Sequence, residues 1–420
     1  MIEESSLRRR DDLTFKANLR DSRHGWIRLT PAYSVHLVAE ILDAERPEGG
    51  LVLDPFCGTG TTALVCAERG IAAETTDINP FLIWLAQAKA RAYAAAELAA
   101  LGRVADRIRA AIRAPSSGAV WAPPLFRIER WWDEATLAAL GRAMAEIRGA
   151  AGEEAPAVLD LARVAFCRTL IERAQVSFGH QSMSFAKAGA EEGETGRGAE
   201  ARSRDAAEAV AQSFERAAES VARGAASAIP TSPRVLHCDA RDLRARLEPE
   251  RYRCVITSPP YPNRMSYIRE LRPYMYWLGY LADGRAAGEL DWQAIGGTWG
   301  VATSNVARWA PERPAPIPFE GFEALLERIA AQSEVLSRYV HKYFHDMARH
   351  AASLFAVMRP GGAVHYIVGN SKFYDVLVPA ERIFAELFAA AGFASPEVRA
   401  IRKRSSKREL YEFVVSARKP

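Results

Sequence analysis

The chain has 420 residues, 49% of them hydrophobic, and a formal net charge of +4 at pH 7. This is enough for one large core or two domains, and the mild basic excess is compatible with nucleic acid without indicating it. No pair among the five cysteines has CxxC spacing, which argues against zinc and redox motifs, so we expect no bound metal. The sequence has no signal peptide and no apolar run of about 18 residues, so we expect a cytoplasmic protein with no membrane partner.

The first 112 residues are expected to form a basic arm followed by alternating strands and helices. Residues 1–24 are charged and show no clear periodicity, which suggests the arm. Short apolar runs that end in an acid predict strands at 50–54 and 71–77. Helices are expected at 34–42 with Ser34 as a candidate cap, at 61–70 closed by Gly70, and at 80–112. A strand–helix–strand–helix start indicates a parallel α/β sheet.

Two insertions are expected to interrupt this sheet. Residues 91–233 are rich in Ala, Arg and Glu with helical periodicity and predict a helical insertion. Residues 280–320 carry Gly, Pro and Trp without periodicity and predict an irregular loop insertion. Further strands are expected at 234–239, 253–258, 363–370 and 411–419, and further helices at roughly 321–358 and at 379–393. The predicted core is therefore α/β, assembled from residues 25–90, 234–279 and 321–420.

The string DPFCGTGTT (54–62) joins the first predicted strand to the helix that follows it. Gly58 and Gly60 allow the backbone to approach a ligand closely, because no Cβ intervenes. The GxGxxG pattern of dinucleotide sites and the Gly-Lys-Ser/Thr of phosphate loops are both absent. An acid directly before the turn also disfavours a polyanion. The string therefore favours a ligand with a positive centre or hydroxyls, such as S-adenosylmethionine.

Two further acids end strands of the same predicted sheet. Asp77 ends the second strand, where an acid can accept both ribose hydroxyls of an adenosine ligand. Asp239 ends the third and could accept from an adenine amino group. Each could instead be a helix cap or a turn residue, which is the commoner role for such an acid taken alone.

The segment TSPPY (257–261) ends the strand predicted at 253–258. Neither proline has an N–H for the sheet ladder, so their carbonyls and the Ser258 hydroxyl remain as acceptors at the strand end. An exposed Tyr261 ring can stack on a planar group. Ligands of open α/β sheets bind beyond the carboxyl ends of the strands, so this segment and Asp54 can face one crevice. Alone, the segment fits a proline-rich turn better; with DPFCGTGTT it predicts a site for a nucleobase amine.

In this order, the two motifs resemble those of the exocyclic-amino DNA methyltransferases, with DPFCGTGTT similar to their cofactor motif and TSPPY to their catalytic motif. The resemblance covers residues 24–90 and 234–279, and 340–420 in pattern. It implies a Rossmann-like class I methyltransferase sheet, mostly parallel, that binds S-adenosylmethionine. Serine in the first position of SPPY is typical of the cytosine-N4 branch, whereas adenine-N6 enzymes more often have Asp or Asn there. The cofactor motif comes first here, while many cytosine-N4 enzymes show the reverse order.

The resemblance also implies roles for individual residues, with the target base flipped out and stacked on Tyr261. The catalytic residues would be Ser258, Pro259, Pro260 and Tyr261. The residues implied in cofactor binding are Thr30, Tyr33, Ser34, Asp54, Pro55, Phe56, Gly58, Gly60, Thr61, Asp77, Ile78 and Asp239. The residues implied in substrate contacts are Asn263, Arg264, Tyr267 and Asn370.

The implied function is site-specific methylation of cytosine N4 in double-stranded DNA. Residues 91–233 are then a candidate target-recognition region, the basic stretches near both ends would contact phosphates, and a separate restriction endonuclease is a candidate partner. Three alternatives stay open. They are an adenine-N6 DNA methyltransferase, an RNA guanine-N2 methyltransferase with a similar Pro-Pro-Tyr site, and a nucleic-acid-binding protein without activity.

Overall fold

The structure is a computed structural model of the chain. The residues it describes are 11–14, 18, 23–29, 32–47, 49–114, 120–177, 184–185, 199–311, 316–404 and 409–420. Thr30 and most of the arm predicted at 1–24 lie outside them. Among the described residues, no helix is both long and apolar enough to cross a membrane.

A seven-stranded sheet forms the centre of the molecule, in the order β10-β11-β7-β6-β1-β2-β5. Neighbours from β7 to β5 pair in parallel, and β11 pairs antiparallel with both β7 and β10. The prediction of an α/β fold with a mostly parallel sheet is confirmed. Its strands are β1 (Leu51–Asp54), β2 (Ala73–Asp77), β5 (Arg234–His237), β6 (Tyr252–Thr257), β7 (Met358–Gly369), β10 (Ala394–Lys403) and β11 (Tyr411–Arg418).

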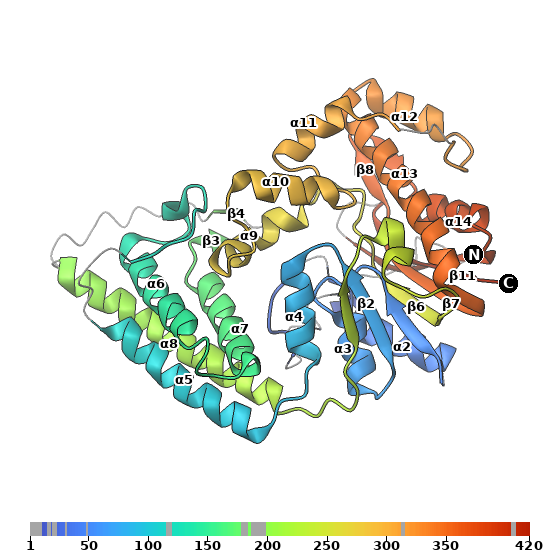
Figure 1. Cartoon of the computed structure of the whole chain (residues 1–420). Coiled ribbons are helices and arrows are strands. Elements are labelled where there is room, and N and C mark those ends of the chain that lie inside the picture. Colours follow the sequence, from blue (N-terminus) through green and yellow to red (C-terminus); the bar gives the residue numbers. More distant parts are fainter. Residues whose placement is uncertain are drawn as a thin grey trace.

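Helices cover both faces of this sheet (Figure 1). On one face, Val52 and Ile256 point toward α2 (Val35–Glu45) and α3 (Thr61–Glu68), with α4 (Pro80–Ala90) beside α3. On the other face, Leu53, Val255 and Tyr366 pack on η4 (Ala240–Ala245), α13 (Glu334–Val357) and α14 (Ala380–Ala390). Side chains alternate between faces along a strand, so apolar residues at every position of a strand require cover on both sides. Packing of helices on both faces of the sheet holds the strands in place, and with them the strand ends that carry the predicted motifs.

The helical insertion predicted at 91–233 is helical in the structure and extends away from the sheet (Figure 1). Its helices share one hydrophobic cluster with α4 and with α9 (Tyr267–Trp277), which places Trp277 at their junction. Arg23 fastens this region to the N-terminal segment, because its buried guanidinium donates to carbonyls of both α4 and the end of α8. The insertion contains α5 (Ala95–Arg113), η3 (Ile128–Arg130), α6 (Glu134–Gly149), α7 (Pro156–Glu172), β3 (Val176–Ser177), β4 (Ser184–Phe185) and α8 (Ala199–Ala225).

Several predicted elements were wrong in detail. The single helix expected at 80–112 is broken into α4 and α5, because Arg23 binds the carbonyls of Lys89 and Arg91 where α4 ends. The helix expected at 321–358 begins as α12 (Phe322–Ala330) and restarts as α13 at the cap Ser333. The strand expected at 363–370 begins earlier, as β7 at Met358, with an irregular register at its start, because Tyr252 of β6 pairs with Met358 and Cys254 pairs with Ala363.

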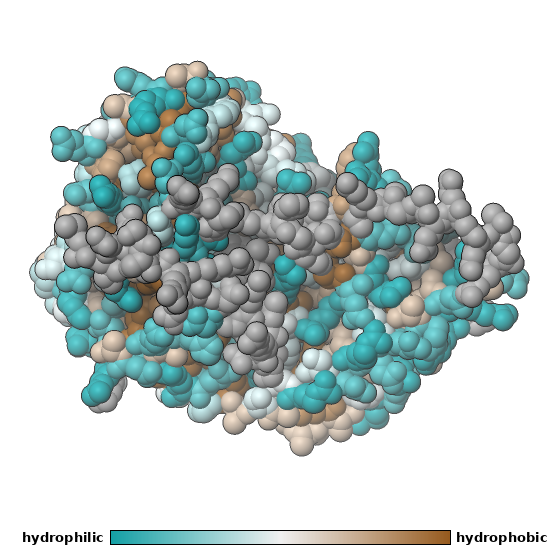
Figure 2. Space-filling view, turned by 180° about the vertical axis from the view of Figure 1, so that it is seen from behind, coloured by the Kyte–Doolittle hydropathy of each residue, from teal (hydrophilic) through white to brown (hydrophobic). Residues whose placement is uncertain are grey.

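The prediction that residues 280–320 form an irregular loop was also wrong. It contains α10 (Gly284–Gln293) and α11 (Val301–Arg308), joined through the buried carboxylate of Asp291, which accepts hydrogen bonds from Ser266 Oγ and Trp299 N. The sequence analysis also missed two helical elements and three strands. They are η4, α9, β8 (Ser371–Phe373), β9 (Val376–Val378) and the ten-residue strand β10, together with the short η2 (Asp11–Leu13). Seen from behind, the surface is mostly hydrophilic, with apolar residues in small separate areas (Figure 2).

Candidate active site

The turn from β1 into α3 forms one wall of a pocket at the carboxyl ends of the parallel strands. Gly58 and Gly60 both have positive φ, of 52° and 79°, which favours glycine at each position. At Gly60 a Cβ would also come within 3.1 Å of the Ala86 Cβ, so glycine lets α3 pack on α4. At Gly58 the nearest atom to such a Cβ is 3.8 Å away, which leaves the space beside it open to a ligand. The first glycine therefore faces the pocket and the second serves packing.

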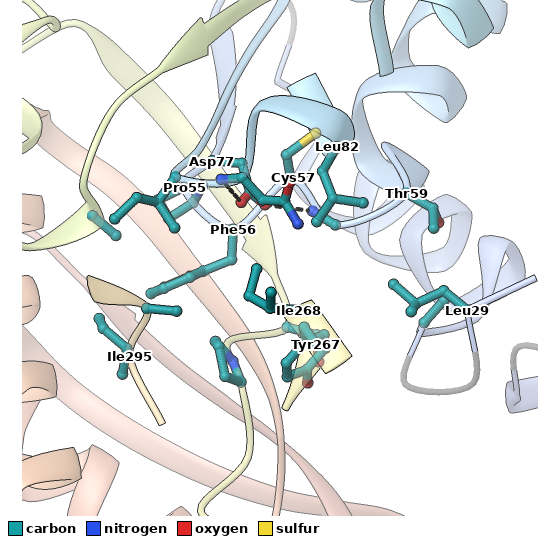
Figure 3. A pocket seen from close by; sticks show the side chains of 18 of the residues that line it. Leu29, Pro55, Phe56, Cys57, Thr59, Asp77, Leu82, Tyr267, Ile268 and Ile295 are labelled. Atoms are coloured by element: carbon teal, nitrogen blue, oxygen red, sulfur yellow. Dashed lines mark hydrogen bonds between the residues drawn. The ribbon is translucent and has the colours of Figure 1, made fainter. Parts of the chain in front are cut away.

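The pocket itself has a volume of about 870 Å³, its open mouth included. Figure 3 shows Pro55, Phe56, Cys57 and Asp77 along one side of it and Tyr267, Ile268 and Ile295 across from them. The predicted site residues that line it are Tyr33, Pro55, Phe56, Gly58, Thr61, Asp77, Ile78, Asp239, Ser258, Pro260 and Tyr267.

Asp77 holds the pocket's acidic side in a fixed orientation. Its Oδ2 accepts from Gly58 N at 3.0 Å and its Oδ1 from Asn79 N at 2.9 Å. Burial raises the pKa of Asp77 to about 6, although these backbone hydrogen bonds favour the ionised form. A carboxylate oxygen can accept more than one hydrogen bond, so both oxygens retain capacity for the hydroxyls of a ligand.

Asp54 lies beneath the pocket and does not line it. Its carboxylate is buried and accepts from Thr257 Oγ1 at 2.6 Å, Tyr33 Oη at 2.9 Å and Phe56 N at 3.1 Å. Burial raises the pKa of Asp54 to about 6. The acid thus ties the end of β1 to the end of β6 and to the N-terminal segment. Its observed hydrogen bonds therefore connect the two predicted motifs and stabilise their relative position.

We expect Tyr33→Phe to lower the free energy of unfolding by about 1.5–3 kcal/mol, because it removes a hydrogen bond to the buried Asp54 carboxylate. Chemical denaturation monitored by circular dichroism measures this loss. Tyr93→Phe is the matched control, since the Tyr93 hydroxyl donates to the Ala88 carbonyl outside the pocket. An equal or smaller loss in Tyr33→Phe than in Tyr93→Phe would contradict the bracing role.

Two other predicted cofactor residues are not brought to the pocket, and a third cannot be placed. Ser34 caps α2, accepting from His36 N and donating to the Asp12 carbonyl, and is fully buried. Gly60 packs on α4 as described above, and Thr30 lies outside the described residues.

Asp239 follows β5, the strand next to β2, and caps η4 on the same side of the pocket as Asp77, where it is paired with Arg241. The Arg241 guanidinium donates to both carboxylate oxygens of Asp239, at 2.7 Å and 3.0 Å for its shortest contacts, and also to the Gln293 carbonyl. Burial alone would raise the pKa of Asp239, but the hydrogen bonds from Arg241 outweigh it and hold the pKa below its ordinary value. Asp239 therefore stays ionised and available as an acceptor.

Ser258 and Pro260 bring the second motif to the same pocket. Ser258 Oγ donates to the Ile367 carbonyl at 3.0 Å, so its hydrogen is used and its lone pairs remain free to accept. The Pro260 carbonyl accepts from Tyr343 Oη at 2.6 Å. The Pro259 carbonyl has no hydrogen-bond partner in the part of the chain that the structure describes, although Pro259 does not itself line the pocket. The strand end is thus an array of oriented acceptors.

The expected exposure of the Tyr261 ring was wrong. Tyr261 is buried, and its hydroxyl donates to Glu412 Oε1 at 2.8 Å. The Arg404 guanidinium lies 4.8 Å from the ring centroid, and Gly369 packs so closely that a Cβ there would approach Tyr261 to 2.8 Å. The segment turns inward because β11 supplies a carboxylate partner from about 150 residues away in sequence.

Three of the residues expected to contact substrate lie in a separate hollow, and only Tyr267 lines the main pocket. These three are Asn263, Arg264 and Asn370. The Asn370 side chain is held in place by two hydrogen bonds, since it donates to the Glu409 carbonyl and accepts from Tyr411 N.

The sequence analysis missed one wall of the pocket. Gln293 ends α10, and Ala294 and Ile295 follow it. All three line the pocket, and the Gln293 carbonyl accepts from Arg241, the partner of Asp239. Their segment was expected to be irregular, so nothing in the local sequence pointed to the site. Other lining residues that were missed are Leu29, Ala32, Cys57, Thr59, Asn79, Leu82, Cys238, Ala240 and Ile268.

The charge of the lining restricts the ligand. Among the described residues that line the pocket, Asp77 and Asp239 are carboxylates and none is a lysine or an arginine. Such a lining fits a ligand with hydroxyls, amines or a positive centre and does not suit a polyphosphate, which is usually bound by cations and backbone N–H groups. Apolar walls from Phe56, Leu82 and Ile295 suit a planar ring. The lining residues therefore fit a ligand such as S-adenosylmethionine.

Comparison with known families gives a more specific match for the first part of the chain. Residues 18–88 match the family model N6_N4_Mtase, described as DNA methylase. The match spans the N-terminal segment, the DPFCGTGTT turn and Asp77, and it ends before the helical insertion. It supports the N6/N4 DNA methylase family and does not distinguish its cytosine and adenine branches.

Two curated type II methyltransferases are similar over short segments. M.BsoBI of Geobacillus stearothermophilus is 35% identical over 81 residues, which are 19% of this chain and 16% of that protein. M.AvaI of Nostoc sp. (strain PCC 7120) is 32% identical over 69 residues, or 16% of this chain and 14% of that protein. The similarity thus spans about a sixth of the length of these relatives.

Among solved structures, an rRNA methyltransferase, AviRa from Streptomyces viridochromogenes, aligns with 92% of this chain and 86% of its own. The identity is 13% and the TM-score is 0.27, which is too low to support any conclusion about function.

Proposed function

We propose that this protein is a DNA methyltransferase that transfers a methyl group from S-adenosylmethionine to N4 of a flipped-out cytosine. The observation that carries the proposal is the meeting of both motifs in one pocket, with Asp77 and Asp239 on its acidic side and Ser258 at the end of β6. The partial match to the DNA methylase family and to type II methyltransferases supports the same chemistry and a DNA substrate.

The cofactor would be held by the β1–α3 turn and the two pocket acids. Asp77 would accept from the ribose hydroxyls, Asp239 from the adenine amine, and the adenine ring would lie against apolar side chains such as Ile295. Gly58 leaves the open space that a close-lying ligand needs. S-adenosylmethionine, when bound, supplies a methyl group on a positively charged sulfur.

The chain's own residues would orient the amine that receives this methyl group. The lone pair of a cytosine N4 is delocalised into the ring, so the amine is a weak nucleophile. Ser258 Oγ and the Pro259 carbonyl would accept its two hydrogens and stabilise the positive charge that develops on nitrogen. The nitrogen forms a bond to the methyl carbon as the carbon–sulfur bond breaks, the bonding electrons go to sulfur, and the amine then releases a proton to solvent.

Ser258 is the feature that favours cytosine over adenine. A hydroxyl whose hydrogen is already donated to Ile367 presents an acceptor without a negative charge. Adenine N6 presents the same kind of amine, so an adenine-N6 DNA methyltransferase is the second candidate. An RNA guanine-N2 methyltransferase is less well supported, because the matched family is of DNA methylases.

We expect cofactor binding to weaken below about pH 6. Asp77 must be ionised to accept both hydroxyls, and its pKa is raised to about 6 in the free protein. The dissociation constant should be constant above about pH 7 and rise up to tenfold per pH unit below about pH 6. Protonation of Asp77 should not destabilise the fold. The pKa of Asp77 is higher in the folded than in the unfolded chain, so the folded protein binds this proton more tightly. Isothermal titration calorimetry from pH 5.5 to 8 measures this, and an equal pH dependence in Asp77→Asn would contradict it.

The base assignment is tested by expressing the protein in a host without DNA methylation and mapping modified bases by single-molecule sequencing. N4-methylcytosine at a defined sequence is the expected result. N6-methyladenine alone would replace the cytosine assignment with the adenine one, and transfer to RNA without any DNA modification would overturn the DNA substrate.

A further inference from the structure

A second hollow of about 950 Å³, open to solvent, lies next to Tyr261 and is not explained by cofactor binding. Four parts of the chain line it. They are Asn263 and Arg264 after the SPPY motif, Leu336 of α13, residues 370–374 with the tip of the β8–β9 hairpin at Tyr374, and the two residues Arg404 and Leu410. We call this hollow the hairpin groove.

The hairpin groove carries excess positive charge. Arg264 is exposed and has no carboxylate partner among the residues that the structure describes. Arg404 donates to the Asn370 carbonyl and lies over the Tyr261 ring, so its charge is also not neutralised by an acid there. Lys372 is paired with Glu409 at 2.8 Å. Two guanidinium groups thus face an open hollow in which one lysine is already paired, an arrangement that attracts anions.

Two further side chains indicate what kind of anion fits. Ser371 is only 3% exposed and lines the groove, yet its Oγ has no hydrogen-bond partner within the described part of the chain. An unpaired buried hydroxyl is costly, so it points to a ligand that supplies an acceptor or donor. Tyr374 is 55% exposed at the hairpin tip, where it presents an aromatic face. Cations, a hydroxyl and an exposed ring together suit phosphates followed by a base.

We propose that the hairpin groove binds the backbone of the DNA strand beside the flipped nucleotide, with Arg264 and Ser371 on a phosphate and Tyr374 stacked on a neighbouring base. This inference rests on the proposed function and extends it to the strand outside the pocket. Chain reach supports it, because Asn263 follows the pocket residue Pro260 by three residues. At most 3.8 Å per residue, this places the groove within about 11 Å of the pocket wall, or roughly three nucleotides.

Arg404 connects the groove to the candidate active site. It covers one face of Tyr261, which is the ring that the resemblance implies in stacking on the target base. In this proposal Arg404 leaves the ring for a phosphate when DNA enters, and the ring face becomes accessible to the flipped base.

The test is binding of a fluorescein-labelled 20-nucleotide DNA strand, followed by fluorescence anisotropy over a series of salt concentrations. Arg264→Gln should raise the dissociation constant about three- to tenfold and reduce the slope of log Kd against log salt by about 0.7. Arg359→Gln is the matched control, because Arg359 is exposed at the opposite end of β7, roughly 35 Å along the strand from Asn370. An effect of Arg264→Gln no larger than that of Arg359→Gln would overturn the proposal.

Two more variants separate ligand contact from a structural role. Ser371→Ala should weaken DNA binding while leaving the unfolding midpoint unchanged or raised, because it removes a hydroxyl that is unpaired in the free protein. Tyr374→Ala should weaken binding at least fivefold, and Tyr374→Phe should restore it. Loss of stability in Ser371→Ala without loss of binding would contradict the assignment of Ser371.

The same assay shows whether the groove binds a DNA strand, free phosphate or RNA. It also separates the proposal for the groove from the proposed methyltransferase function. Complete displacement of the labelled strand by 10 mM inorganic phosphate would indicate a site for small anions and overturn a strand-binding groove. Tighter binding of an RNA strand of the same sequence would overturn the DNA assignment of the groove. If Arg264→Gln weakens DNA binding while the wild-type protein transfers no methyl group, the groove stands and the proposed function fails.

Discussion

Replacement of Ser258 by alanine is expected to lower the rate of methyl transfer by about 10²–10³-fold, while the dissociation constant for S-adenosylmethionine changes by less than about twofold. Ser258 Oγ is held as an acceptor by its hydrogen bond to the Ile367 carbonyl. Its removal takes away one oriented group that stabilises charge on the amine, and such groups commonly account for an effect of this size. Single-turnover kinetics with saturating cofactor measure the rate, and calorimetry measures the affinity.

Ser416→Ala is the matched control for this variant. The Ser416 hydroxyl also makes one hydrogen bond within the sheet, to His365 Nδ1 at 2.9 Å, but it lies on β11 outside the pocket. We expect wild-type rates from this control. A Ser258→Ala enzyme that transfers methyl groups at the wild-type rate would refute the role of the SPPY serine.

Replacement of Asp77 by alanine is expected to weaken S-adenosylmethionine binding by at least about 100-fold. The variant loses the acceptors for two ligand hydroxyls, and hydrogen bonds to a charged group contribute about 1.5–3 kcal/mol each. It also leaves Gly58 N and Asn79 N without their partner, so the β1–α3 turn loses one of its hydrogen bonds to β2. Calorimetric titration at pH 7.5 measures the affinity.

Asp77→Asn separates these two effects, because an asparagine oxygen can still accept one of the backbone hydrogen bonds. We expect an affinity between those of the wild type and Asp77→Ala. Asp242→Ala is a suitable control, since Asp242 is exposed in η4 and does not line the pocket. Wild-type affinity in Asp77→Ala would show that the acid at the end of β2 does not hold the cofactor.

The parts of the site that follow strand ends could be predicted from the sequence. Short apolar runs that end in Asp54, Asp77 and Ser258 indicated parallel strands, and the carboxyl ends of parallel strands meet at one edge of a sheet. Glycines at 58 and 60 indicated the turn, and both have the positive φ that the turn requires. The local sequence pattern and the rule that ligands bind at the carboxyl ends of parallel strands were sufficient to predict these strand ends and the glycine turn.

The remaining features depend on contacts between segments distant in sequence. Asp54 turned out to be buried because Tyr33 and Thr257 surround it, and Tyr261 because Glu412 of β11 binds its hydroxyl. The pocket wall at Gln293 depends on Arg241, which is 52 residues away. A sequence pattern shows which residue types are available, but not which of them a distant strand or helix will cover.

The central claim is that one pocket presents a methyl donor to the amine of a cytosine, and the most direct test is an isotope experiment. Purified protein is incubated with duplex DNA of high sequence complexity and S-adenosylmethionine that carries a trideuterated methyl group. The DNA is digested to nucleosides, which are analysed by mass spectrometry. We predict trideuterated N4-methyldeoxycytidine, formed about 10²–10³-fold more slowly in the Ser258→Ala reaction. Deuterated methyl groups only on adenine would contradict the choice of base, and no deuterated nucleoside from DNA would contradict the proposed function itself.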